Sequence, residues 1–122
     1  MAREAVWAVI TGMYDAYARE DRAGIDRLLH PEATIWDSAD PTLITSREQL
    51  EKVRDARPAD GPPETGVRAY DEVVDMWGDT ALARYLLRVD FAEGEPEIVR
   101  TTAVLRRIDG EWVIVHIHEN TL

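Results

Sequence analysis

The end of the chain places two imidazoles and a carboxylate within one short stretch, because residues 111–119 read EWVIVHIHE. His116 and His118 are separated by a single residue, and Glu119 follows directly. Histidines at this spacing can bind one metal ion or exchange protons near neutral pH. They can also simply share one face of a strand, since alternate residues of a strand point the same way. The rest of the chain has to distinguish these alternatives.

A metal site is the weakest of the three, because a third ligand is hard to find. His30 is the only other histidine, it stands before Pro31 at the end of a predicted helix, and the chain contains no cysteine. Protein zinc sites use at least three protein ligands. The sequence also lacks a phosphate loop and a dinucleotide fingerprint. We therefore expect no bound metal and no cofactor.

Strand alternation predicts which face of the last strand carries the histidines. It places two sets on opposite faces: Val113, Val115, Ile117 and Glu119, and Trp112, Ile114, His116 and His118. The first set is almost entirely apolar and predicts the covered inner face of a sheet. The second set, with Val104, Leu82 and Leu86, makes the outer face apolar enough to predict a homodimer interface that includes Trp112, Ile114 and His116. Interfacial packing is thus favoured over catalysis for the histidines, although His118 is kept among the catalytic candidates.

The elements that position these residues can be read from hydrophobic spacing and turn signals. Apolar residues recur every three or four positions over 2–19, which predicts a helix. Asp21 is a plausible N-cap for a second helix, RAGIDRLLH, and SREQ at 46–49 has the capping-box pattern of a third. The run ATIWD and four later runs between residues 67 and 119 alternate like strands and are separated by Gly and Asp turns. Helices followed by a meander predict a single α+β domain over 1–122, with the helices on one face of a curved antiparallel sheet.

Composition narrows the class of partner. The formal net charge of −10 repels phosphate backbones and anionic lipids, so neither nucleic acid nor a membrane surface is an expected partner. The opening MAREAVWAVITGM has only a short apolar run and an early acidic residue, so we expect neither a signal peptide nor a spanning helix, and a cytoplasmic location.

Two longer stretches carry a family resemblance that covers nearly the whole chain. AREDRAGIDRLLHPEATIWD and DGEWVIVHIH, in this order and spacing, resemble the SnoaL-like branch of the nuclear transport factor 2-like superfamily. The second stretch is also similar to the closing strand of the calcium/calmodulin-dependent kinase II hub domain. The resemblance implies a cone-shaped fold, an open pocket between sheet and helices, and dimers formed through the outer sheet face.

The resemblance also implies where the chemistry would lie. ATIWD resembles the strand that carries the proton-shuttling carboxylate in ketosteroid isomerases, and Asp37 falls on that position. Met13 and Ala103 stand where those enzymes have a tyrosine and a protonated carboxylic acid. In the cone, the expected catalytic candidates facing inward are Tyr17, Asp37, Tyr85 and Glu119. The expected pocket wall comprises Met13, Trp36, Leu87, Ala103, Val115 and Ile117.

These residues predict acid–base chemistry. A carboxyl group enclosed by apolar side chains should have its pKa raised by desolvation, as a general base or acid near neutral pH requires. A pocket tyrosine could donate a hydrogen bond to a developing enolate or alkoxide. We therefore expect a cofactor-independent cyclase, isomerase or hydratase/hydrolase acting on a hydrophobic small molecule. The alternatives are a non-catalytic ligand-binding or subunit-assembly domain, and for Asp37 a role in the turn that begins at Ser38.

Overall fold

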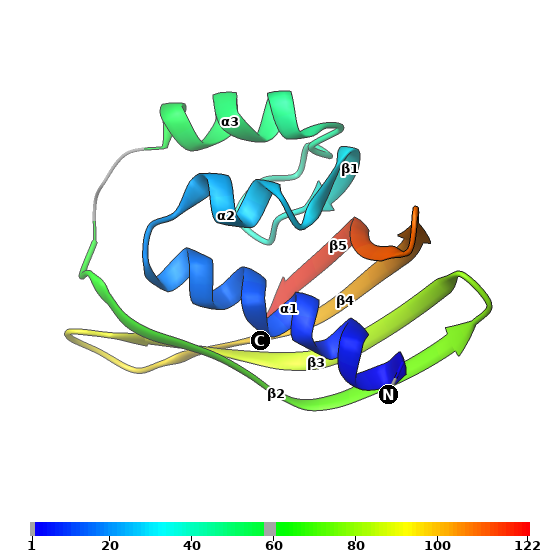
Figure 1. The fold of residues 1–122 in the computed structure, drawn as a ribbon. Helices are drawn as coiled ribbons and strands as arrows, with labels where there is room; N and C mark the ends of the chain where they lie inside the picture. Colours follow the sequence, from blue (N-terminus) through cyan, green and yellow to red (C-terminus); the bar gives the residue numbers. More distant parts are fainter. Residues whose placement is uncertain (1, 58–60) are drawn as a thin grey trace.

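The computed structural model describes residues 2–57 and 61–122, which form three helices and a five-stranded sheet (Figure 1). In chain order the elements are α1 (Ala2–Ala18), α2 (Arg22–Asp26), β1 (Leu29–Trp36), α3 (Arg47–Ala56), β2 (Glu64–Trp77), β3 (Thr80–Phe91), β4 (Glu97–Ile108) and β5 (Glu111–Thr121). All three helices lie on the same side of the curved sheet. The predicted α+β class, with helices on one face of a curved sheet, is confirmed.

The helix starts follow from their capping residues. The Asp21 carboxylate accepts the backbone N–H of Gly24 at 2.9 Å, and the Ser46 hydroxyl accepts that of Gln49 at 3.1 Å. The second helix is nevertheless shorter than predicted and ends at Asp26. The residues that follow join the sheet instead, because the Leu28 carbonyl accepts the N–H of Ile114 and β1 begins at the next residue.

The strand order is β1-β5-β4-β3-β2, with every neighbouring pair antiparallel except β1 and β5, which are parallel. The sheet is therefore mixed, whereas the sequence predicted an antiparallel one. The β4–β5 turn contains Asp109 at φ 52° and Gly110 at φ 81°. Two successive residues with positive φ are what a tight hairpin turn of matching twist requires, and the Asp-Gly pair supplies them.

A β-bulge in β5 changes which side chains face the core. The register places His116 opposite Val104 but Ile114 opposite Leu105, so Val115 is an extra residue between them. Ile114 is 0% exposed and Ile117 is 4% exposed, so both belong to the core although their positions differ by three.

The bulge overturns part of the predicted interface. Trp112 packs against the core and Ile114 lies inside it, so the prediction that these two residues occupy the outer face is wrong. The alternation assumed an uninterrupted strand, and the extra residue reverses it for everything before Val115. His116 and His118 follow the bulge, and their cross-strand partners Val104 and Thr102 place them on the outer face, as predicted.

No helix in the described part of the chain is long and apolar enough to cross a bilayer.

Candidate functional site

A pocket of about 450 Å³ lies between the helices and the inner face of the sheet, where the resemblance implied one. Its apolar wall includes Met13, Ile25, Leu29, Leu50, Leu87, Phe91 and Ile117. Phe91 ends β3, in the second half of the chain, whereas Met13 lies in α1, in the first half. The pocket is therefore formed by elements from both halves of the chain, and beside its apolar wall it is lined by charged residues, which are Asp37, Arg54, Arg57, Glu64, Glu97 and Glu119.

Glu119 is the carboxyl group of the pocket whose pKa this environment raises. It lies near the end of β5 and lines the pocket. The pKa of the Glu119 carboxyl is raised to about 7, mainly by burial and next by repulsion from Asp37, while the positive charge of Arg57 opposes both effects. At neutral pH this carboxyl is consequently present in both its protonated and its ionised form, as a group that exchanges protons with a substrate must be.

Asp37 makes the turn contact that was one of the two sequence-based alternatives, and it also lies in the pocket wall. It follows β1, it lines the pocket, and one carboxylate oxygen accepts the backbone N–H of Ala39 at 2.9 Å. The other oxygen forms an ion pair with Arg57, which lies just after α3. Asp37 therefore shapes a turn and also faces the pocket, and its environment is a cationic partner instead of the expected apolar wall.

A pair of tyrosines forms a second polar feature of the pocket. The hydroxyl oxygens of Tyr14 and Tyr85 are 2.7 Å apart, and their rings meet edge to face with centroids 5.9 Å apart. Burial is the main reason why the pKa of each hydroxyl is raised, so both groups stay protonated and can donate hydrogen bonds. Tyr14 lines the pocket, whereas Tyr85 is 4% exposed within the core.

Sequence reasoning missed Tyr14 and Arg57. Tyr14 follows Ile10 by four positions and Trp7 by seven, which is the spacing of one helix face, so this signal was available. Arg57 pairs with Asp37, twenty positions earlier, and no local sequence pattern predicts such a contact.

Tyr17 lies at the rim of the pocket. Its side chain is 45% exposed, and its hydroxyl donates to the Glu64 carboxylate, with O···O distances of 2.8 and 2.7 Å to the two oxygens. Burial and this carboxylate raise the pKa of the Tyr17 hydroxyl. The contact joins the end of α1 to the start of β2 at the pocket mouth.

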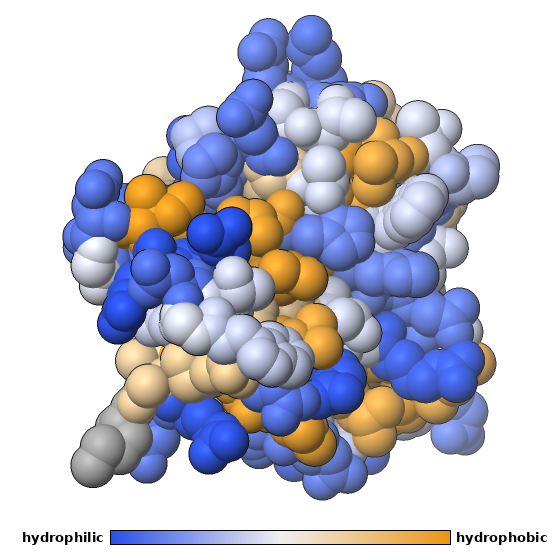
Figure 2. Space-filling model, turned by 90° about the vertical axis from the view of Figure 1, so that its right-hand side faces the viewer, coloured by the Kyte–Doolittle hydropathy of each residue, from blue (hydrophilic) through white to orange (hydrophobic). Residues whose placement is uncertain are grey.

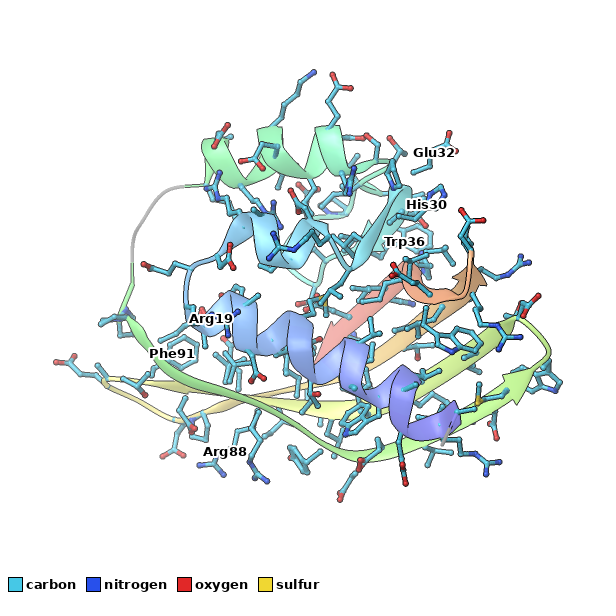
Figure 3. The ribbon with its side chains drawn as sticks, in the orientation of Figure 1. Arg19, His30, Glu32, Trp36, Arg88 and Phe91 are labelled. Atoms are coloured by element: carbon cyan, nitrogen blue, oxygen red, sulfur yellow. The ribbon has the colours of Figure 1, made fainter. Side chains whose placement is uncertain are left out.

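Two further predicted site residues lie on the outer face. The ring of His118 packs on that of Trp36, with centroids 5.7 Å apart, and Trp36 is 44% exposed (Figure 3). Trp36 follows the inward residue Ile35 and therefore points outward. The predictions that Trp36 lines the pocket and that His118 could act within it are wrong.

Two other predicted wall residues lie away from the pocket. Ala103 is 0% exposed and packed in the core, and Val115 is the extra residue of the bulge. Neither lines the chamber that contains Glu119, so these two predictions are also wrong.

The histidine pair is held by outer-face contacts. His116 Nδ1 lies 2.7 Å from the Thr34 hydroxyl, and burial together with His118 lowers the pKa of the His116 imidazole. Among residues 2–57 and 61–122, no three His, Asp or Glu side chains are grouped so that they could hold a metal ion. That the protein binds no metal stays a prediction.

The curved sheet, the three helices on one of its faces and the pocket between them form the fold that is also seen in solved nuclear transport factor 2-like proteins. The SnoaL-like domain family matches residues 6–120, and the chain belongs to this family. No curated protein matches the chain in sequence.

Solved structures share the fold at low sequence identity. The calcium/calmodulin-dependent kinase II hub homology domain of Chlamydomonas reinhardtii is 23% identical, with a TM-score of 0.81 over 100% of this chain and 99% of that one. A nuclear transport factor 2-like protein of unknown function from Pseudomonas putida is 21% identical, with a TM-score of 0.83 over 98% and 85%. A candidate ketosteroid isomerase from Parabacteroides distasonis is 22% identical, with a TM-score of 0.76 over 93% and 85%. At these identities the likeness establishes the fold alone.

Proposed function

We propose that this chain is a cofactor-independent proton-transfer enzyme that acts on a small, largely apolar molecule carrying a carbonyl group. The observation that carries the proposal is Glu119, whose pKa is raised to about 7 inside a chamber that also contains the Tyr14 hydroxyl. The likeness to a candidate ketosteroid isomerase supports the same class of chemistry. Relative to the sequence-based expectation, the proton-carrying role moves from Asp37 to Glu119.

In the proposed reaction, the ionised Glu119 carboxylate removes a proton from the carbon next to the substrate carbonyl. As the C–H bond breaks, its electron pair moves toward the carbonyl and negative charge develops on the oxygen. Tyr14 donates a hydrogen bond to that oxygen while Tyr85 donates to Tyr14, since the two hydroxyls are 2.7 Å apart. The protonated Glu119 then returns its proton to the same carbon or to a conjugated one, and the second outcome is an isomerisation.

Asp37 and Arg57 support this role through their charges. Asp37 repels the ionised form of Glu119, whereas Arg57 attracts it and also forms an ion pair with Asp37. The net effect of burial and these two charges leaves the carboxyl poised near neutral pH.

We predict that the wild-type protein accelerates hydrogen–deuterium exchange next to the carbonyl of neutral, apolar ketones, and that the rate rises with pH through about 7. The measurement is exchange of a ketone panel in D₂O, followed by NMR. Tyr14→Phe should lower the rate by roughly 10²–10³-fold, because it removes the donor to the developing oxyanion. Tyr70→Phe removes the same atom on the outer face, where Tyr70 is paired with Leu86, and should leave the rate unchanged. Equal rates in all three proteins and in buffer would refute the proposal.

A second candidate function is subunit assembly through the outer sheet face. Leu82, Leu86 and Val104 are half-buried there, and Val73 is 54% exposed. The end of the molecule seen in Figure 2 shows apolar residues only as separate patches between hydrophilic ones, so it is the less suitable interface. The likeness to kinase hub domains supports oligomeric assembly. We propose a homodimer whose interface includes Val104 and His116 but neither Trp112 nor Ile114.

Val104→Glu should therefore convert a dimer into a monomer, because it puts an unpaired charge in the middle of the apolar patch. We expect the dimer to be weakened about a hundredfold or more. Ala8→Glu adds the same charge on the exposed side of α1 and should leave the dimer intact. Sedimentation at micromolar concentration measures the oligomeric state of the wild type and of both variants. A monomeric wild type would disprove the proposed interface.

A further inference from the structure

Two polar groups without a hydrogen-bond partner lie side by side on the inner face of the sheet, one of them buried and the other half-buried. Thr101 in β4 is 3% exposed, and its Oγ1 is the one buried side-chain polar atom of the described residues that makes no hydrogen bond. Glu119 stands directly opposite Thr101 in the β4–β5 register. No hydrogen bond between described residues involves the Glu119 carboxyl. Thr101 is thus an exception to the rule that buried polar atoms are paired, and its cross-strand neighbour Glu119 is a half-buried carboxyl that also makes no hydrogen bond.

The register leaves Glu119 as the polar neighbour that Thr101 can reach. Cross-strand partners in an antiparallel pair have Cβ atoms about 4.5–5.5 Å apart, which a threonine hydroxyl and a glutamate carboxylate can span. On its other flank Thr101 faces Tyr85, whose hydroxyl bonds to Tyr14 at 2.7 Å and makes no hydrogen bond to Thr101. A rotation about χ1 of Thr101 is enough to turn its hydroxyl from one flank to the other.

The charge of Glu119 decides when such a bond matters. An ionised carboxylate accepts hydrogen bonds only, and hydrogen bonds to an ionised group are stronger than those between neutral groups. A buried hydroxyl without a partner carries a free-energy penalty that the same bond removes. The contact therefore favours the ionised form of Glu119 over the protonated form.

We propose that the Thr101 hydroxyl donates a hydrogen bond to the ionised Glu119 carboxylate and thereby holds this carboxylate in place for proton transfer. Thr101 is thus a positioning residue, and its importance for turnover rests on the proposed function of Glu119. The other groups that face Glu119 are Asp37 after β1, Arg57 after α3, Tyr14 and Tyr17 on α1, and Tyr85 on β3. None of them is a hydrogen-bond donor to the carboxylate in this structure.

The test is an NMR titration of the Glu119 carboxyl in the full chain, which needs no substrate. Thr101→Val keeps the shape of the side chain and removes the hydroxyl, so the pKa of Glu119 should rise by about one, a tenfold gain in proton affinity. Thr101→Ser restores the hydroxyl and should titrate like the wild type. Thr102→Val removes the neighbouring hydroxyl on the outer face and is the matched control, expected to change nothing. If Thr101→Val does not fold, Thr101→Ala carries the same expectation.

A Glu119 titration that is unchanged in Thr101→Val would overturn the proposal, and so would an equal shift in Thr102→Val, which would indicate a general effect on the strand. In the exchange assay, the pH profile of Thr101→Val should move to higher pH together with the titration. A shifted titration in a protein that catalyses no exchange would support the Thr101–Glu119 bond and refute the enzyme. Catalysed exchange together with an unshifted titration would support the enzyme and refute the Thr101–Glu119 bond.

Discussion

Glu119→Gln should remove most of the catalysed proton exchange while making the folded chain more stable above pH 7. The amide cannot take up a proton from carbon, and loss of a positioned acid–base group typically lowers a rate by about 10²–10⁴-fold. The fold should tolerate the change, since the amide has nearly the shape of the carboxyl and carries no charge into the pocket. Functional sites commonly contain a group that is needed for activity although it lowers the stability of the fold.

The sign and the pH range of the stability change follow from the pKa. Folding raises the pKa of Glu119 from 4.5 to about 7, so the folded chain binds this proton more tightly than the unfolded chain does. Glu119 costs the fold almost nothing below pH 4.5; its cost grows between pH 4.5 and about 7 and then stays at roughly 3 kcal/mol. Wild type and Glu119→Gln should therefore have similar unfolding temperatures at pH 4, and the difference should develop between pH 4.5 and 7 and stay constant at higher pH.

The matched control is Glu111→Gln, which removes the same charge from the exposed beginning of the same strand. It should change neither exchange activity nor the pH dependence of unfolding. A Glu119→Gln protein that unfolds at the wild-type temperature at every pH would show that Glu119 is solvated. Retained exchange activity in that variant would exclude Glu119 as the proton-carrying group.

The parts of the fold that the sequence predicts are those governed by local chemistry. The Asp21 and Ser46 caps need only the next three residues, and the turn at Asp109 needs only two adjacent residues that tolerate positive φ. The order of helices and strands follows from hydrophobic period, which is also a local property.

The site was less predictable because its contacts connect distant segments. Asp37 meets Arg57 only once α3 has packed beside β1, and Tyr14 meets Tyr85 across seventy-one positions of chain. The raised pKa of Glu119 likewise depends on burial beneath elements that come much earlier in the sequence. Residue types identified the candidates, but only the packing decides which carboxyl is desolvated and which is paired.

The bulge at Val115 has a different cause. The run WVIVH consists of residues that all suit a strand, and nothing in it distinguishes a regular strand from one with an inserted residue. The pairing with β4 determines where the bulge lies. Leu105 pairs with Ile114 and Val104 pairs with His116, which is possible only if one residue of β5 is skipped. A single skipped residue reverses the assigned faces of all residues before it.

Ile114→Ala is expected to destabilise the chain strongly, whereas Val113→Ala should change stability little. Ile114 is 0% exposed in the core and Val113 is only half-buried, opposite the exposed Arg106. Truncation of a fully buried isoleucine leaves a cavity and typically costs about 2–5 kcal/mol, and the Val113 variant should lose less than about 1 kcal/mol. Uninterrupted alternation of the strand predicts the opposite ranking, so the two variants together test the bulge.

Urea unfolding of both variants and the wild type at one protein concentration gives the comparison, because a fixed concentration keeps any contribution from dimerisation equal. If the slope of the unfolding free energy against urea concentration is the same in all three proteins, the variants differ in stability alone. If Val113→Ala were the more damaging change, the β5 register would be regular, Trp112 and Ile114 would return to the outer face, and the interface proposed around Val104 would have to include them. The ranking therefore bears on the assembly of the protein as well as on its core.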